Sequence, residues 1–212
     1  TARARGVPNF SVFSMHKYTP PAMRAILDAG EVRLDGVIGP GHVSTIIGLR
    51  AWDFLPREYG IPVVVAGFEP VDILLAVKML VEQAAAGEAR AENAYSRSVR
   101  PEGNRAALRI MDQVFEPVDA PWRGFGVLPA SGMGVRAAWR EFDAQARFIL
   151  PDVPSREPPG CRCGEVLRGI IEPLACPLFG RACTPDRPLG PCMVSDEGAC
   201  AAHYLYQSAN VV

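Results

Sequence analysis

The placement of the cysteines constrains this chain more than any other feature. The chain has 212 residues and six cysteines, and all six lie between Cys161 and Cys200. Thiols confined to one short stretch indicate metal or redox chemistry in a reducing compartment sooner than a disulfide framework. Residues 161–212 are also rich in proline and glycine and have few long apolar faces. So short a segment buries little apolar surface, and a bound metal or cluster would supply the missing stability.

The overall composition is typical of a water-soluble globular protein. Hydrophobic residues make up 49% of the chain, charged residues 21%, and the net charge is −1. Proteins that bind nucleic acids or anionic membranes usually carry an excess of positive charge, which this chain does not have. We therefore expect neither partner. No apolar run approaches the roughly 20 residues that span a bilayer. We therefore expect a cytoplasmic protein.

We do not expect the first residues to form a secretory signal peptide. The sequence Thr1-Ala2-Arg3-Ala4-Arg5-Gly6 has arginines but no apolar stretch after them, which a secretory signal peptide requires. The chain also does not begin with methionine, so we expect further residues upstream.

Residues 1–150 alternate between strand and helix patterns. This alternation predicts an α/β fold with a doubly wound, mostly parallel sheet. The expected strands are residues 9–14, 34–38, 61–66 and 124–128, and the expected helices are residues 20–30, a helix from Ser44, and residues 71–86, 103–115 and 134–147.

The composition changes near residue 150. Residues 151–160 contain four prolines and read as a linker. We therefore expect an α/β domain over residues 1–150, a proline-rich linker over residues 151–160, and a small cysteine-rich module over residues 161–212.

The cysteine spacing leaves three kinds of site open. There is no C-x₂-C pair, the usual zinc-binding unit, and His203 follows Cys200 too closely for a standard zinc finger. The spacing also differs from both ferredoxin patterns, yet four thiolates suffice for a [4Fe-4S] cluster. Two cysteines would then be left as a dithiol or disulfide pair. A cluster is favoured, with a zinc site and three structural disulfides as the alternatives.

Two histidine-containing loops are further candidates for binding. Gly39-Pro40-Gly41-His42 ends a strand and opens a helix, where backbone N–H groups can face an anion or an iron-bound unit. The simpler interpretation is a tight turn with Ser44 or Thr45 as the helix cap. His16 follows another expected strand, where α/β sheets place their ligands, although it could be an ordinary loop residue.

Charged residues of the same region allow two interpretations. Capping of a helix explains Glu69 and Asp72 adequately. The segment with Arg97, Arg100, Glu102 and Asn104 could line the same cleft or form a solvated polar connection. No phosphate-binding loop, dinucleotide fingerprint or nucleophile elbow is present.

Several longer motifs resemble those of the HypD family of hydrogenase-maturation proteins, in its C-terminal part. They include Cys161-Arg162-Cys163-Gly164-Glu165 and Gly190-Pro191-Cys192-Met193, with residues 176–180, 183–185 and 197–202. Upstream motifs cover residues 16–17, 20–23, 39–48, 93, 95–97 and 102–104. The resemblance extends over nearly the whole chain.

This resemblance implies one [4Fe-4S] cluster beside a redox-active cysteine pair, an arrangement similar to ferredoxin–thioredoxin reductase. Carried over position by position, the cluster ligands are Cys161, Cys176, Cys183 and Cys200. The redox pair is Cys163 and Cys192. The residues that would line a binding cleft are His16, His42, Ser44 and Thr45.

The implied function is a scaffold and redox component for assembly and insertion of the Fe(CN)₂CO centre of [NiFe] hydrogenase. The implied partners are a small iron-sharing chaperone of the HypC type and a cyanide-delivering factor of the HypE type. The family also has an upstream domain with a cysteine that would hold the iron unit, and residues 1–160 contain no cysteine. The chain therefore resembles a fragment or a truncated member.

An alternative of another class is a stand-alone disulfide reductase of the ferredoxin–thioredoxin type. It would require an exposed attacking thiol with a low pKa and a thioredoxin-like client. Trapping of a mixed disulfide with thioredoxin through Cys163 or Cys192 would favour it.

Overall fold

The computed structural model describes residues 1–151 and 158–206, which form two compact units. One unit runs from Leu34 to Phe115, and the other combines residues 1–33 with the chain from Glu116 onward. The linker expected at 151–160 falls largely outside the described residues. The division of the chain at that linker stays a prediction.

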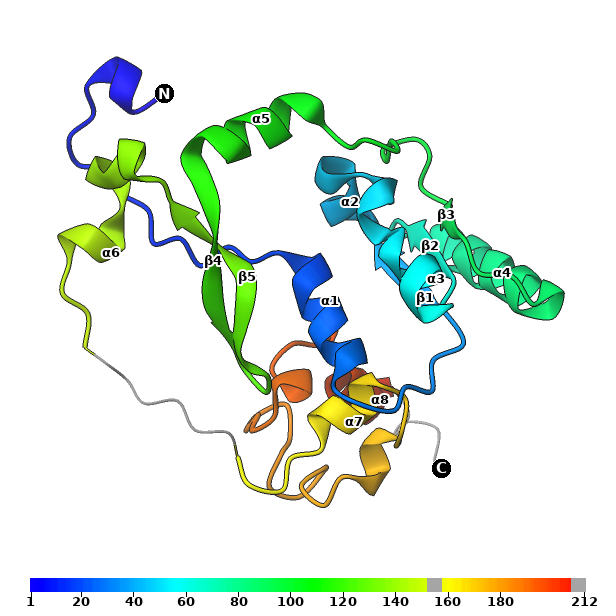
Figure 1. The fold of residues 1–212 in the computed structure, drawn as a ribbon. Coiled ribbons are helices and arrows are strands. Elements are labelled where there is room, and N and C mark those ends of the chain that lie inside the picture. Colours follow the sequence, from blue (N-terminus) through cyan, green and yellow to red (C-terminus); the bar gives the residue numbers. More distant parts are fainter. Residues whose placement is uncertain (152–157, 207–212) are drawn as a thin grey trace. The chain divides into compact units, whose positions relative to one another are not determined.

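The unit from Leu34 to Phe115 is built on a parallel sheet of three strands (Figure 1). The strands β1 (Val37–Pro40), β2 (Val63–Ala66) and β3 (Ala91–Asn93) lie in this order. All four residues of β2 are buried, as expected of a central strand whose three valines have both faces covered. The α/β class and the parallel pairing are confirmed.

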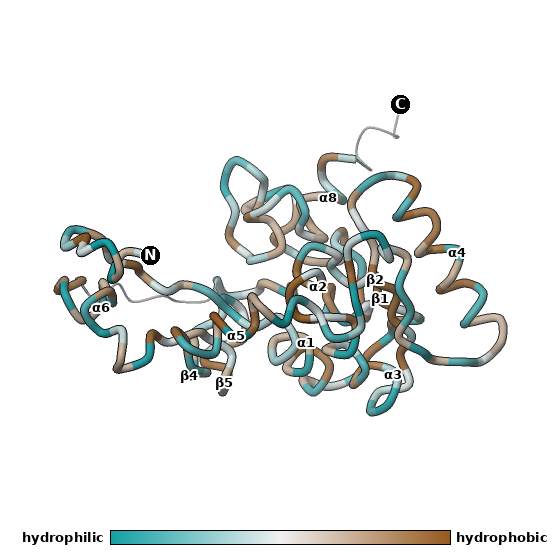
Figure 2. Tube along the Cα trace, turned by 90° about the horizontal axis from the view of Figure 1, so that it is seen from above, coloured by the Kyte–Doolittle hydropathy of each residue, from teal (hydrophilic) through white to brown (hydrophobic). Residues whose placement is uncertain are grey.

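Helices connect these strands, and one more helix follows the last strand. They are α2 (Gly41–Ile47), η2 (Leu49–Trp52), α3 (Phe54–Tyr59), α4 (Pro70–Ala86) and α5 (Arg105–Val114). Helix α4 packs Ala76 and Leu80 against Val64, while its Val71 and Leu74 stay exposed. Apolar and polar turns alternate along this helix in Figure 2. It begins at a proline and ends before a glycine, as the sequence pattern predicts.

A buried tryptophan in η2 is linked by hydrogen bonds, through helix α2, to the end of β1. Trp52 is fully buried, and its Nε1 donates to Ser44 Oγ at 2.8 Å. The Ser44 hydroxyl donates in turn to the carbonyl of Pro40, at the end of β1, at 2.7 Å. Every polar atom of this chain of contacts is therefore satisfied without water.

The second unit contains an antiparallel hairpin and several short helices. The hairpin strands are β4 (Phe115–Trp122) and β5 (Gly126–Val135), and α1 (Thr19–Asp28) packs against β5 (Figure 1). The short helices are η1 (Arg3–Arg5), η3 (Ala137–Phe142), α6 (Ala144–Arg147), α7 (Cys163–Leu167), η4 (Pro173–Ala175), η5 (Pro191–Met193) and α8 (Ala199–Tyr206). In the described residues, no helix is both long and apolar enough to cross a membrane.

The hairpin corrects two sequence-based expectations. A strand at 124–128 was expected to extend the parallel sheet, and a helix was expected from Gly134, but β5 pairs with β4 and continues to Val135. The reason lies in two strand glycines. A Cβ at Gly132 would lie 2.7 Å from Ala120 Cβ, and one at Gly134 would lie 2.6 Å from Val118 Cγ1. These glycines permit close pairing of the strands rather than starting a helix.

The strand expected at residues 9–14 is also wrong. Val12 forms only an isolated bridge with Asp143, its N–H donating to the carbonyl of Phe142 at 2.8 Å. The partner segment is the junction of η3 and α6, and helical turns offer single contacts but no extended edge.

The buried core of the Leu34–Phe115 unit gives a stability test. Leu55→Ala removes a fully buried side chain and should lower the free energy of unfolding by about 2–5 kcal/mol, because the cavity only partly collapses. Native-state hydrogen exchange of the β2 amides measures the change. Leu74→Ala, at a side chain that is 69% exposed, is the matched control and should change it by less than about 0.5 kcal/mol. Equal losses in both variants would contradict this packing.

Candidate functional site

All six cysteines line one cavity, which we call the sulfur cavity. Its remaining walls are Leu178, Phe179, Gly190 and Met193. Among these residues, Cys163, Cys192 and Met193 are buried. These thiols are spread over residues 161–200, and the fold of residues 158–206 brings them together.

Short helices and turns position the thiols. Cys163 begins α7, Cys176 follows η4, and Cys200 lies in α8. Cys183 lies in a turn. Its own N–H donates to the carbonyl of Leu178 at 2.9 Å, and its Sγ accepts from the N–H of Leu189 at 3.4 Å. Proline at the first position of η4 and of η5 starts both turns with a preset φ.

Two of the six cysteines are joined. The structure links Cys163 and Cys192 as a disulfide, with Cα atoms 6.3 Å apart, which is within the usual range. Two glycines make room around them. A Cβ at Gly190 would lie 2.6 Å from Cys161 Sγ, and one at Gly198 would lie 2.3 Å from the carbonyl oxygen of Cys192. The redox role predicted for this pair stays a prediction.

The other four cysteines influence one another electrostatically. Burial raises the pKa of the Cys200 thiol to about 11, and the neighbouring Cys176, Cys183 and Cys161 add to the shift. All four therefore lie within electrostatic range around one space. Within residues 1–151 and 158–206, no three His, Cys, Asp or Glu side chains are grouped so as to hold a single metal ion.

A charged pair lies beside the opening of α7. Arg162 and Glu165 form an ion pair one helical turn apart. This contact lowers the pKa of the Glu165 carboxyl and raises that of the Arg162 guanidinium, which the nearby Cys176 also favours. Arg162 therefore lies within electrostatic range of Cys176.

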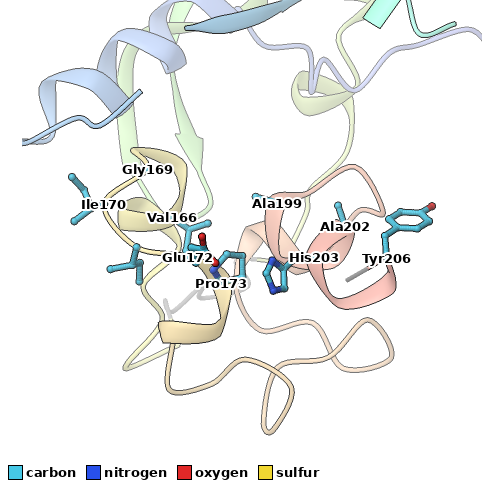
Figure 3. Close-up of a pocket in the computed structure, with 10 residues that line it drawn as sticks. Val166, Gly169, Ile170, Glu172, Pro173, Ala199, Ala202, His203 and Tyr206 are labelled. Atoms are coloured by element: carbon cyan, nitrogen blue, oxygen red, sulfur yellow. The ribbon is translucent and has the colours of Figure 1, made fainter. Parts of the chain in front are cut away.

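A groove in the same unit was missed by the sequence analysis. Figure 3 shows its lining, with Ala199, Ala202, His203 and Tyr206 from α8 on one side. Val166, Gly169, Ile170, Ile171, Glu172 and Pro173 form the rest. The ring of His203 packs edge-on against Phe179, with centroids 5.5 Å apart. Most of these residues are apolar, and they do not form a recognisable binding or catalytic motif in the sequence. The sequence alone therefore does not indicate the groove.

A second group of functional candidates gathers at the carboxyl ends of β1, β2 and β3. The His42 ring lies 4.8 Å from that of Phe68 and 6.4 Å from that of Tyr95, measured between centroids. These residues follow the three strands in turn. Open α/β sheets bind their ligands at this edge. His42 therefore lies where a ligand-binding residue of such a sheet is expected.

An ion-pair network lies beside these rings. Arg97 donates to both oxygens of Asp72, at 2.7 and 2.6 Å, and lies 3.0 Å from Glu69 Oε2. Its guanidinium also covers the Tyr95 ring at 4.3 Å. The hydrogen bonds from Arg97 are the main cause that lowers the pKa of Asp72 to about 2. Sequence reasoning explained Asp72 as a helix cap and missed this partner, which is distant in the chain.

The remaining predicted cleft residues differ in exposure. Ser44 is fully buried, and its hydroxyl is engaged with Trp52 and Pro40, so binding a ligand would require breaking an internal hydrogen bond. Thr45 is half-buried and its Oγ1 lies 2.9 Å from Ser98 Oγ. His16 is exposed in the other unit, with Nδ1 3.4 Å from Ser14 Oγ. Their binding roles stay predictions.

The Asp72–Arg97 pair gives a prediction about pH. The lowered pKa means that the pair contributes stability fully above about pH 4, and that this contribution is lost as the pH falls toward 2. Arg97→Gln should return the pKa of the Asp72 carboxyl toward 3.8, as followed by a carboxyl NMR titration. Arg50→Gln, which breaks an exposed pair with Glu102, should leave it unchanged. An Asp72 pKa that is the same with and without Arg97 would refute the pairing.

Comparison with known proteins identifies the relatives of this chain. The family profile described as "HypD: Hydrogenase formation hypA family" matches residues 1–207. The chain is 49% identical over 211 residues to the hydrogenase expression/formation protein HupD of Azotobacter chroococcum, and 47% identical over 212 residues to the hydrogenase maturation factor HypD of Cupriavidus necator. Each alignment covers 97% of this chain and 56% of the relative, so the chain spans about half the length of these relatives. This chain belongs to the HypD family.

Proposed function

We propose that this chain is the part of a hydrogenase maturation factor that carries a [4Fe-4S] cluster, held by Cys161, Cys176, Cys183 and Cys200. The observation that carries the proposal is that these four thiols line one cavity while the remaining two cysteines are joined. Such a division into four and two matches the split expected from the family resemblance. It also leaves four thiolates, the number that a [4Fe-4S] cluster requires.

The donor set fits this group in its chemistry. Thiolates are the usual ligands of iron–sulfur clusters, and Leu178, Phe179 and Met193 provide an apolar surround. The raised pKa of Cys200 means that this thiol must lose a proton when it binds metal. Loading should therefore be favoured by rising pH.

The joined pair supplies a second capability. Reduction of the Cys163–Cys192 disulfide takes up two electrons and two protons and yields two thiols. A cluster at the adjacent thiols, when bound, supplies single electrons. We assign to the pair the reduction of a partner protein or of an iron-bound intermediate.

In the cell, the proposed role is assembly and insertion of the Fe(CN)₂CO centre of [NiFe] hydrogenase, in the cytoplasm. The relatives are named hydrogenase maturation or formation proteins, which supports the broad role. The proposed partners are an iron-sharing chaperone of the HypC type and a cyanide-delivering factor of the HypE type. Since residues 1–160 contain no cysteine, the thiol that holds the iron unit is assigned to the part of the longer relatives that this chain does not span.

The stand-alone reductase is the weaker candidate. The family match runs over residues 1–207 and therefore includes the sheet unit as well as the cysteine-rich segment. A reductase module alone would not explain that similarity.

Metal analysis of cysteine variants tests the cluster. Anaerobically purified wild type should contain about four irons and four acid-labile sulfides per chain, with a broad visible absorption. Cys176→Ser should lose most of the iron and sulfide, because it removes a proposed ligand. Cys163→Ser, which removes only the paired thiol, is the matched control and should keep both.

Two results would reject this assignment. Stoichiometric zinc in the wild type would indicate a structural zinc site. Equal loss of iron in Cys163→Ser and Cys176→Ser would reject the division of the cysteines into four ligands and one pair.

A further inference from the structure

A polar pocket in the Leu34–Phe115 unit is not explained by the proposed function. It is lined by Thr45, Ser98, Arg100, Glu102, Gly103, Asn104 and Arg105, and we call it the arginine pocket. Every one of these residues belongs to the same compact unit. The pocket contains no cysteine and lies apart from the sulfur cavity in the sequence.

The walls of the arginine pocket are fixed by backbone contacts. The N–H of Leu49 donates to the carbonyl of Arg100 at 3.2 Å, and the N–H of Asn104 donates to the carbonyl of Ile46 at 2.9 Å. Gly103 has a φ of 67°, and a Cβ there would lie 2.2 Å from the carbonyl oxygen of Ile46. This crossing of backbones needs glycine, and it holds the segment from Ser98 to Arg105 in place without any ligand.

The charges in the pocket favour an anion. Arg100 and Arg105 are exposed, and in the described residues neither guanidinium has an ion-pair or hydrogen-bond partner. The one carboxylate in the lining, Glu102, lies 3.1 Å from Arg50, which offsets its charge. Two arginine side chains therefore offer donors whose planar fork suits carboxylate and phosphate oxygens.

The start of α5 does not supply this site by itself. The side chain of Asn104 already accepts from the N–H groups of Ala106 and Ala107, at 3.1 Å each. The Thr45 hydroxyl donates to the carbonyl of Gly41 at 3.1 Å, so Ser98 is the donor in the 2.9 Å contact between the two hydroxyls. Both hydroxyl hydrogens are therefore used inside the fold, which leaves Arg100 and Arg105 as the charged donors of the pocket.

We propose that the arginine pocket binds a small oxyanion, either a phosphate or a carboxylate group, between Arg100 and Arg105. The Glu102 carboxylate limits the affinity, because it repels an anion. This inference goes beyond the proposed maturation role, and it requires no iron at the cysteines. Its failure therefore leaves the cluster proposal untouched, and the reverse also holds.

Isothermal titration calorimetry on the full chain tests this site, with inorganic phosphate and N-acetylglycine as the two probes. At least one probe should bind, and added potassium chloride should weaken the binding. Arg100→Gln and Arg105→Gln should each weaken it about tenfold or more, because each removes charged donors. The tighter of the two probes shows whether the natural ligand presents a phosphate or a carboxylate.

Two further variants keep this test specific. Arg109→Gln, one helical turn beyond Arg105 and outside the pocket, is the matched control and should bind like the wild type. Glu102→Gln should bind more tightly, because it removes the only negative charge of the lining. Absence of binding for both probes, unchanged binding in the Arg100 and Arg105 variants, or an equal loss in Arg109→Gln would overturn the proposal.

Discussion

The convergence of six cysteine side chains on one cavity is the constraint on which the segment from residue 158 to residue 206 depends. Between residues 158 and 206 the described structure has short helices and turns but no strand of its own. Its buried cluster consists of Cys163, Cys183, Cys192, Met193, Cys200 and Ala201, so sulfur-bearing side chains replace the usual branched aliphatic core. So small a core gives limited stability, and a group bound by the thiols would contribute directly to folding.

The unit from Leu34 to Phe115 has instead a core of aliphatic side chains around a sheet, and its helices and strands were predictable from the sequence. The run of valines in β2 indicates a strand buried on both faces, and Pro70 and Gly87 bracket the long helix α4. These signals are local, because each depends on residues a few positions apart. The hairpin of β4 and β5 escaped prediction because Pro117 and Pro121 interrupt the strand pattern, and a two-stranded edge tolerates both.

The candidate sites were also predictable to different degrees, because some depend on local sequence signals and others on contacts between distant residues. The cysteines are conspicuous in the sequence, but spacing alone left cluster, zinc and disulfides open, and only the family resemblance divided them into four and two. The contact of Arg97 with Asp72 joins residues 25 positions apart, and no local pattern indicates it. The burial of Ser44 beneath Trp52 likewise depends on tertiary packing, so a hydroxyl that looks available in the sequence is engaged inside the fold.

Native mass spectrometry of the anaerobically purified chain tests the central claim most directly, because one spectrum reports both the bound group and the oxidation state of the remaining cysteines. The account predicts a single main species whose added mass equals one cluster of four irons and four sulfides, with the Cys163–Cys192 disulfide intact. A chain that carries one zinc ion, or a metal-free chain in which all six cysteines have formed three disulfides, would contradict it.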